Sequence, residues 1–378
     1  MKDNIKSKKR IDEYGEVMTP ERLVEEMLDS LPSEIWKDRN KKWIDNSCGS
    51  GNFLFAVMNR LSQFHDKKYI LENMIWGVDI QEDNVEETKK RLGGGNIIQA
   101  DALTFDYWEG KKFEVVVGNP PYNKEKKGKK GNNCNPLWDI FVSFIVDSIL
   151  EDNGYLCLVH PPLWRKPEHK LWYKLRNYQF EKIRIFSMKE SSDIFGVATK
   201  VDYYVMRKSK ADKETEIIGE NNKTHKIQVF DKDFIPNKYF DGVYKIFSGK
   251  TDIIYSCAYH HYTQKHMSKE KDEIYKFPCI YLANKKGITY YYSSVNNKGH
   301  FGQSKIIVPL GSFQPILDFE GEYGMCEVCF GIPIKSLEHG EKIMKLFRNE
   351  KFLKLLEACK WKTVQFDYRL FKYFWDLS

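Results

Sequence analysis

The sequence has no uninterrupted apolar run of about 18 residues, so it predicts no membrane-spanning helix. The first ten residues are polar and basic, and no apolar core follows them, which argues against a secretory signal. The eight cysteines are scattered, and only Cys326 and Cys329 form a CxxC pair. A structural zinc site needs four ligands, so we expect reduced thiols and no metal. These absences predict a soluble, cytoplasmic protein.

The composition is that of a globular protein with more than one domain. The chain has 378 residues, of which 42% are hydrophobic and 15% aromatic, enough to bury a large core. The formal net charge of +7 is compatible with a polyanionic partner, but many globular proteins are equally basic.

Short apolar runs alternate with amphipathic segments from about residue 43 onward, and this pattern predicts an α/β fold with a mainly parallel sheet covered by helices on both faces. A charged segment between Arg207 and Lys226 then interrupts the pattern, so we divide the chain into domains at 1–208 and 209–378. The second, smaller domain mixes β-like runs with amphipathic helices at 340–359, which predicts an α+β fold. The seven runs predicted as strands of the first domain are 43–45, 75–79, 96–101, 113–117, 155–159, 182–188 and 201–206.

The tetrapeptide Asn119-Pro120-Pro121-Tyr122 follows the apolar run that ends at Gly118. Because proline cannot continue a sheet ladder, the tetrapeptide should lie at the carboxyl edge of the strand, where open α/β sheets bind ligands. A side-chain amide beside two rigid prolines and an aromatic ring suits the binding of an exocyclic amino group while the ring stacks on its base. The tetrapeptide therefore indicates chemistry on an amino nitrogen.

A glycine-rich turn and two acidic strand ends precede the tetrapeptide. Glycines in the turn at 45–53 would allow a ligand to approach the backbone, although this pattern alone is equally that of an ordinary strand-to-helix turn. The next two predicted strands end at Asp79 and Asp101. A carboxylate at the first position suits ribose hydroxyls, and one at the second suits an adenine amino group.

In this order and spacing, the motifs resemble those of the S-adenosylmethionine-dependent amino methyltransferases of DNA, over roughly residues 12–208. More specifically, the chain resembles the gamma class of adenine-N6 enzymes found in restriction-modification systems. The resemblance implies a Rossmann-like class I methyltransferase domain followed by a DNA target-recognition domain. One departure is Asn46, where relatives often have proline or alanine, and we expect it to change loop rigidity more than chemistry.

The resemblance also implies roles for individual residues. The Asn119 side-chain oxygen and the Pro120 carbonyl would accept the two amino hydrogens of a flipped adenine, while Tyr122 stacks on the base. Phe195 occupies the place of a second aromatic contact, with a core phenylalanine as a close alternative. Thr19 is implied as a cofactor contact, and the residues alone also predict it as the N-cap of a helix starting at Pro20. The complete cofactor-binding set implied is Thr19, Asp45, Cys48, Gly49, Gly51, Asp79, Ile80, Asp101 and Asn119.

A lysine-rich segment follows the tetrapeptide at 124–131, with five lysines against one glutamate. It could be a solvated loop or a contact to DNA phosphates, and the second interpretation predicts a salt-dependent affinity. The lysines predicted to bind DNA are Lys124, Lys126, Lys127, Lys129 and Lys130.

Several alternatives stay open. The same tetrapeptide serves glutamine methyltransferases of proteins and adenine methyltransferases of structured RNA, and a silent DNA-binding subunit would also keep the fold. Adenine is favoured over cytosine because relatives acting on cytosine often have serine in place of Asn119. We expect a monomer that acts on double-stranded DNA without cleaving it, and a separate cognate restriction endonuclease would be compatible with this role.

Overall fold

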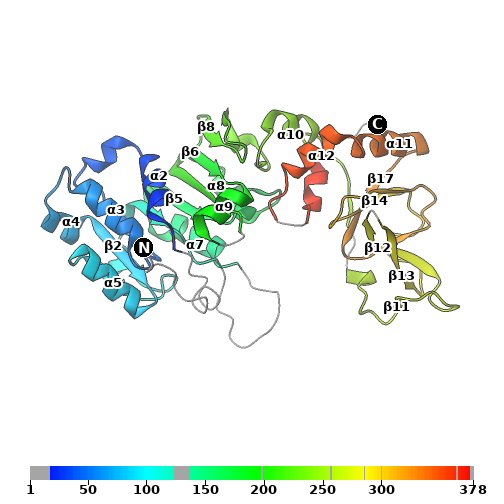
Figure 1. The fold of residues 1–378 in the computed structure, drawn as a ribbon, viewed down its shortest axis with the longest axis horizontal. Coiled ribbons are helices and arrows are strands. Elements are labelled where there is room, and N and C mark those ends of the chain that lie inside the picture. The colour runs from blue at the N-terminus through cyan, green and yellow to red at the C-terminus, as the bar shows by residue number, and fades with distance from the viewer. Residues whose placement is uncertain are drawn as a thin grey trace. The chain divides into compact units, whose positions relative to one another are not determined.

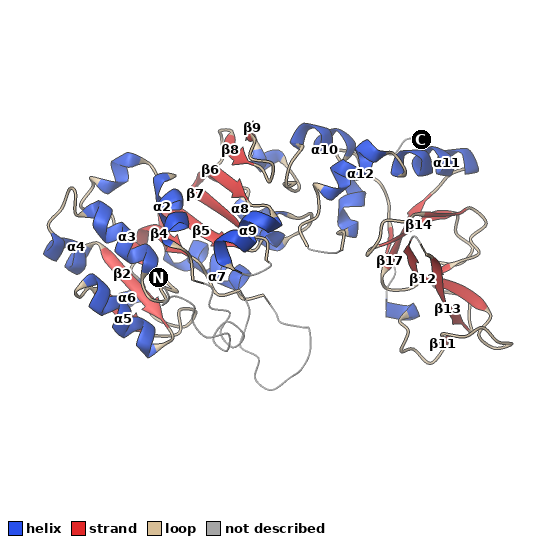
Figure 2. Cartoon of the chain, in the orientation of Figure 1, coloured by secondary structure: helices blue, strands red, loops and turns tan. Residues whose placement is uncertain are grey.

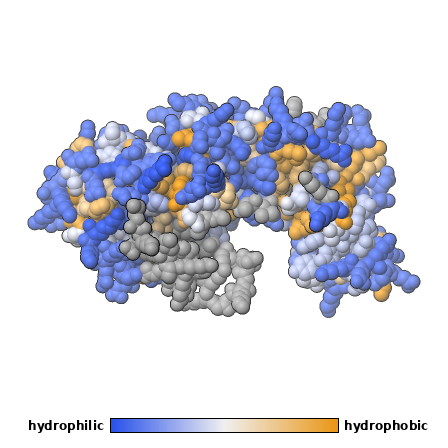
Figure 3. All heavy atoms as spheres, viewed as in Figure 1, coloured by the Kyte–Doolittle hydropathy of each residue, from blue (hydrophilic) through white to orange (hydrophobic). Residues whose placement is uncertain are grey.

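The structure, a computed structural model, describes residues 18–122, 136–196, 199–255, 258–284, 286–298, 300–362 and 365–374. The chain divides into two compact units (Figure 1). The first comprises Met1–Trp164 and His169–Asp233, and the second comprises Arg165–Glu168 and Phe234–Ser378. No helix in the described residues is long and apolar enough to cross a membrane. The face seen in Figure 3 is largely hydrophilic, with apolar patches between the hydrophilic residues.

The described part of the first unit contains a nine-stranded sheet in the order β3-β2-β1-β4-β5-β7-β6-β8-β9. Strands β1 to β5 run parallel, and β7 lies antiparallel between β5 and β6. Strands β2 and β4 are almost entirely buried, as expected where helices cover both faces. The bounds are β1 (Trp43–Asp45), β2 (Ile75–Asp79), β3 (Asn96–Gln99), β4 (Phe113–Gly118), β5 (Leu150–His160), β6 (Tyr178–Ile185), β7 (Asp202–Lys210), β8 (Thr215–Ile218) and β9 (Thr224–Ile227).

Helices flank this sheet (Figure 2). Amphipathic helices α2 and α3 pack against each other, and α3 also contacts β1 and β2. Helix α7 continues into the π-helical turn η2 (Ile145–Ile149), which contacts β5. The helices of the unit are α2 (Glu21–Asp29), α3 (Asn52–Leu61), α4 (Lys67–Asn73), α5 (Glu82–Leu92), α6 (Tyr107–Gly110), α7 (Trp138–Phe144), α8 (Lys170–Leu175) and α9 (Met188–Phe195), with 3-10 turns at Ser33–Trp36, Pro162–Arg165 and Val229–Asp231.

The sheet extends beyond the seven strands expected from the sequence. Strands β8 and β9 form an added edge hairpin, and the first unit continues to Asp233, so the boundary predicted after residue 208 lies too early. The charged segment predicted a domain boundary, but an edge hairpin also tolerates charged residues on its solvent side. Thr215 and Ile217 are nevertheless fully buried, and the Thr215 hydroxyl donates to the Phe180 carbonyl at 3.0 Å.

The second unit contains both sheets and helices. Its described residues form two four-stranded sheets, β10-β17-β14-β15 and β11-β13-β12-β16. A buried ion pair joins Lys305 to Asp318 at 2.6 Å across the β14–β15 pairing. The strands are β10 (Ile254–Tyr255), β11 (Met267–Ser268), β12 (Phe277–Asn284), β13 (Gly287–Ser293), β14 (Lys305–Pro309), β15 (Ile316–Asp318), β16 (Gly324–Met325) and β17 (Cys329–Pro333).

The amphipathic helices predicted at 340–359 correspond to two helices of the structure, Leu337–Phe347 and Glu350–Glu357. The first helix ends at Phe347 with Arg348 as its C-cap. Asn349 caps the second helix, because its side-chain oxygen accepts from the amides of Lys351 and Phe352 at 2.9 and 3.3 Å. The helices of this unit are α10 (Phe240–Ile246), α11 (Leu337–Phe347) and α12 (Glu350–Glu357), with 3-10 turns at Ala258–His260 and Tyr368–Tyr373.

Candidate active site at the carboxyl edge of the sheet

The tetrapeptide lies where β4 ends beside β1. These two strands are neighbours in the sheet, although they begin 70 residues apart in the sequence, at Trp43 and Phe113. Ile44 pairs with Val116, so Asp45 and Gly118 end neighbouring strands at the same edge. Gly118 has a φ of +152°, and a Cβ atom there would lie 2.7 Å from the Asp45 Oδ1 atom. The absence of a side chain at Gly118 therefore lets the carboxyl group of Asp45 approach the backbone just before Asn119.

Asp45 is a buried acid with an unusual pKa. Its Oδ1 atom accepts from the Ser47 amide at 3.0 Å, and 2% of the residue is exposed. Burial raises the pKa of this carboxyl group to about 7, the Ser47 amide partly opposes the rise, and the nearby Asp79 adds to it. Among the described residues, no lysine, arginine or histidine forms an ion pair with Asp45. The negative charge of its carboxylate would therefore be available to a bound cation.

Asp79, at the end of β2, holds the glycine-rich turn in place. Its Oδ2 atom accepts from the Gly49 amide at 2.8 Å, and its Oδ1 atom accepts from the Asn84 side chain at 3.0 Å. The Thr88 hydroxyl donates to the Gly49 carbonyl at 2.9 Å from helix α5. Gly51 has a φ of +80°, and a Cβ atom there would lie 2.8 Å from the Thr88 side chain. Hydrogen bonds thus fix the conformation of this turn, in which Gly49 and Gly51 have left-handed backbone conformations.

Two further predicted residues lie exposed at this edge. Asp101 follows β3 and accepts from the Leu103 amide at 3.0 Å. Ile80 follows β2, and 56% of this apolar side chain is exposed. The ends of β1, β2 and β3 therefore present three carboxylates and one uncovered apolar side chain at one edge of the sheet.

Thr19 reaches the tetrapeptide from the segment before α2. Its hydroxyl oxygen accepts from the Asn119 Nδ2 group at 3.1 Å, and its carbonyl accepts from the Asn52 side chain at 2.9 Å. The prediction of Thr19 as a helix N-cap is wrong, because α2 begins at Glu21, the N-cap is Pro20 and no side chain caps the helix. The Thr19 hydroxyl instead accepts a hydrogen bond from Asn119, which lies 100 positions later in the sequence.

Three more predicted residues differ in their surroundings. Tyr122 is 9% exposed, and burial raises the pKa of its phenol. Cys48 is 5% exposed, and burial together with the Asp45 and Asp79 charges raises the pKa of its thiol, so it stays protonated. Phe195 is half-buried at the end of α9, and no ring contact in the described part of the chain joins it to Tyr122.

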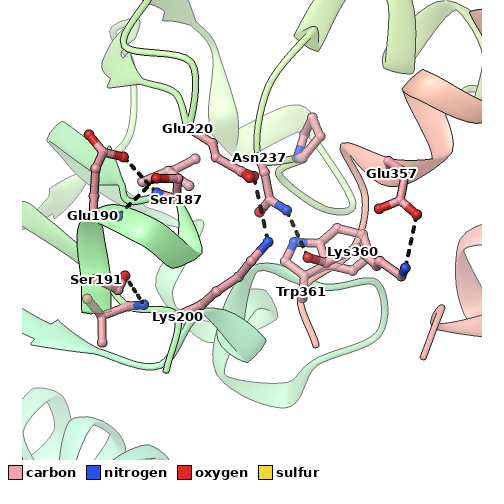
Figure 4. A network of polar contacts seen from close by, with 12 residues as sticks. Ser187, Glu190, Ser191, Lys200, Glu220, Asn237, Glu357, Lys360 and Trp361 are labelled. Atoms are coloured by element: carbon pink, nitrogen blue, oxygen red, sulfur yellow. Dashed lines mark hydrogen bonds and ion pairs between the residues drawn. The ribbon is translucent and has the colours of Figure 1, made fainter. Parts of the chain in front are cut away.

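Helix α9, which carries Phe195, is fixed by its polar contacts (Figure 4). Ser187 and Glu190 form a reciprocal capping box, in which the Glu190 side chain accepts from the Ser187 amide at 2.8 Å. The Ser191 hydroxyl accepts from the Val201 amide at 3.3 Å after the helix. These contacts fix the start of α9 and its connection to β7.

Comparison with known proteins gives these contacts a context. Residues 93–195 match the family of the Eco57I restriction-modification methylase. The chain is 28% identical over 161 residues to the type II restriction enzyme and methyltransferase RM.BcgI of Heyndrickxia coagulans, over 39% of this chain and 24% of that protein. It is 29% identical over 157 residues to the type II methyltransferase M.VspI of Vibrio sp. (strain 343), over 38% of this chain and 36% of that protein. Over part of its length, the chain is similar in sequence to methyltransferases of restriction-modification systems.

These relatives match only part of the chain, which itself spans about a quarter to a third of their lengths. Among solved structures, the type IIL restriction-modification enzyme MmeI in complex with DNA is similar in fold, with a TM-score of 0.54. The alignment covers 99% of this chain and 68% of that chain at 13% sequence identity, so the likeness concerns the fold alone.

Sequence reasoning missed the polar residues that hold this candidate site together. Asn52, Asn84 and Thr88 bind the N-terminal segment, the Asp79 carboxylate and the glycine turn, respectively. A signal was present, because Asn84 and Thr88 are polar residues four positions apart on the buried side of α5. The lysines predicted to bind DNA lie within residues 123–135, outside the described residues.

Proposed function

We propose that this chain is an S-adenosylmethionine-dependent DNA methyltransferase that modifies the N6 amino group of an adenine flipped out of duplex DNA. The observation that carries the proposal is the position of Asn119-Pro120-Pro121-Tyr122 at the carboxyl edge of the sheet, beside the buried Asp45 and the glycine turn. The sequence relatives are methyltransferases of restriction-modification systems, which supports methyl transfer to DNA.

The residues at the sheet edge fit S-adenosylmethionine. The cofactor carries ribose hydroxyls, an adenine amino group, an ammonium group and a sulfonium, all of which are hydrogen-bond donors or cations. Asp45, Asp79 and Asp101 supply carboxylates that match these groups, and the exposed Ile80 side chain offers an apolar surface for the adenine ring. When bound, the cofactor would supply the methyl group as an electrophile on sulfur.

In the proposed mechanism, the chain positions the acceptor amine rather than deprotonating it. The Asn119 side-chain oxygen and the Pro120 carbonyl accept the two amino hydrogens and draw the lone pair out of conjugation with the ring. In-line transfer then needs no strong general base. Positioning of this kind contributes up to about 7 to 11 kcal/mol in favourable intramolecular reactions.

Tyr122 would offset part of the cost of extruding the base. Removing a base from the stack costs a few kcal/mol, and stacking on an aromatic side chain returns roughly 1 to 3 kcal/mol. Because Tyr122 is 9% exposed, the proposal requires that its ring become uncovered when the base enters.

We further propose that the second unit recognises the DNA sequence. Residues 274–317 contain no aspartate or glutamate, whereas the chain as a whole has 53. This stretch includes the paired strands β12 and β13, where Tyr281 and Tyr291 pack with their rings 4.8 Å apart. A stretch without acidic residues and with lysine, asparagine and tyrosine side chains suits phosphates and base edges.

The proposal is tested by incubating the chain with S-adenosylmethionine labelled in its methyl group and, separately, with duplex DNA, RNA and a protein extract. The expected product is N6-methyladenine in DNA after nucleoside analysis. Label found only in methylglutamine, in RNA or in N4-methylcytosine would refute it.

The role of Asn119 is tested by Asn119→Ala, which should abolish transfer and leave cofactor affinity nearly unchanged. Asn177→Ala, at an exposed asparagine after α8, is the matched control and should transfer at the parental rate. Full activity of Asn119→Ala would refute the mechanism.

A further inference from the structure

The hydrogen bond between Thr19 and Asn119 has a defined direction. The Asn119 Nδ2 group donates and the Thr19 hydroxyl oxygen accepts, at 3.1 Å, in a region where Thr19 is only 4% exposed. A side-chain amide has one donor end and one acceptor end on a rigid plane. In this arrangement the Asn119 nitrogen faces the Thr19 hydroxyl oxygen, and the amide oxygen lies on the other side of the amide group.

The orientation of this amide matters for the proposed reaction. The base presents an amino group, which donates, so it needs the oxygen of Asn119 in front of it. A flipped amide would present a second amino group and would leave both donors unsatisfied in a desolvated site. An isolated amide can rotate about its terminal torsion, because this torsion is broad and roughly two-fold.

The segment that carries Thr19 is itself fixed by hydrogen bonds, so the Thr19 hydroxyl can hold the Asn119 side chain in one position. Its carbonyl accepts from Asn52, the first residue of α3, which follows directly on the glycine turn. Pro20 comes next, and its carbonyl accepts from the Leu23 and Val24 amides in the first turn of α2. The segment is thus fixed between two helices.

We infer that Thr19 is a positioning residue, whose hydroxyl oxygen holds the Asn119 amide with its carbonyl oxygen toward the target amino group. This inference rests on the proposed function, and it differs from the cofactor contact that the family resemblance implied for Thr19. A cofactor contact would change affinity for S-adenosylmethionine, whereas a positioning role changes the rate of transfer from the bound state.

The test compares Thr19→Val, which keeps the shape but removes the acceptor, with Thr19→Ser, which keeps the hydroxyl. In single-turnover transfer to DNA, Thr19→Val should be roughly ten- to a hundred-fold slower than the parent, the range expected for one lost hydrogen bond in a buried site. Thr19→Ser should stay within about three-fold of the parent, and the Kd for S-adenosylmethionine should change little in either variant.

Thr215→Val is the matched control for the loss of a buried threonine hydroxyl. Thr215 donates to the Phe180 carbonyl in β6, so its loss should lower stability and leave the transfer rate unchanged. If Thr19→Val transfers at the parental rate, the inference is wrong while the proposed function stands. A Kd that weakens in parallel with the rate would also overturn it and would restore the cofactor-contact interpretation.

A second measurement does not depend on activity. With asparagine labelled by ¹⁵N, the side-chain amide resonances of Asn119 can be identified by their loss in Asn119→Ala. Thr19→Val should shift these resonances and speed their exchange with solvent, and Thr19→Ser should not. Unchanged resonances in Thr19→Val would overturn the inference, whether or not the parent is active. A parent that transferred methyl groups to none of the substrates would refute the proposed function, which is a separate outcome.

Discussion

Replacing Asp45 by asparagine should make the protein more stable at neutral pH and leave it nearly unchanged in acid. In the unfolded chain this carboxyl group ionises near its ordinary pKa of 3.8, whereas burial raises the pKa to about 7 in the folded state. Between these values the folded state keeps a proton that the unfolded state has released. The free energy of unfolding therefore falls as the pH rises through this window.

The size of the effect follows from the two pKa values. Each unit of difference corresponds to about 1.4 kcal/mol, so a rise of about three units costs the parent roughly 4 kcal/mol by the time the pH exceeds 7. Asparagine has the same shape, can accept from the Ser47 amide and carries no charge at any pH. Asp45→Asn should thus match the parent near pH 4 and exceed its free energy of unfolding by roughly 4 kcal/mol near pH 8.

Urea denaturation of both proteins across this pH range measures the difference directly, and groups that titrate equally in both cancel. Asp101→Asn, at an exposed carboxylate on the same sheet edge, controls for the loss of one negative charge. A difference between Asp45→Asn and the parent that is the same at pH 5 and pH 8 would refute the reasoning. The stabilised variant should also bind S-adenosylmethionine poorly, because it lacks the charge that the cationic groups would meet.

Three further predictions follow from other parts of the structure. Gly118→Ala should lower the rate of methyl transfer and destabilise the fold by more than Gly287→Ala, which also has a positive φ but an open Cβ position, as unfolding and transfer assays would detect. Lys305→Met should lower the free energy of unfolding in urea by about 3 to 5 kcal/mol because it leaves a buried carboxylate unpaired, whereas Lys342→Met, in an exposed pair, should cost less than about 1 kcal/mol. Ser187→Ala should cost about 1 kcal/mol in the same assay through loss of the α9 cap, and no change would contradict the capping role.

Much of the sheet could be predicted because apolar runs bounded by glycine and acidic residues carry a strong signal. The predicted strands at 43–45 and 75–79 coincide with β1 and β2, and the run at 113–117 lies within β4. The edge hairpin β8–β9 was lost because its charged residues give the composition of a linker, although Thr215 and Ile217 are buried. Periodicity identifies a strand that is buried on both faces more reliably than one at an edge.

The sequence predicted that the proposed site residues lie at one edge of the sheet, but it did not predict the contacts between them. Asp79 ends β2 and Asp101 follows shortly after β3, and the carboxyl ends of parallel strands meet at one edge of a sheet, so the sequence could place both residues there. The bond from Asn119 to Thr19 could not be found, because it depends on how α2 and its preceding segment pack against the sheet. Local sequence instead favoured Thr19 as an N-cap, a role that Pro20 occupies.

The same packing explains why a buried acid is retained at the end of β1. Asp45 lies against Gly118, which precedes the catalytic asparagine of the proposed reaction, and close to Asp79, whose charge raises its pKa further. An apolar residue there would avoid the cost of a buried carboxylate. It would also remove the negative charge from the place where a cationic cofactor is proposed to bind. The destabilisation expected from Asp45 at neutral pH is therefore explained by the need for a negative charge at the proposed cofactor site. Asp45→Asn tests both effects of this side chain, because it should raise stability and weaken cofactor binding.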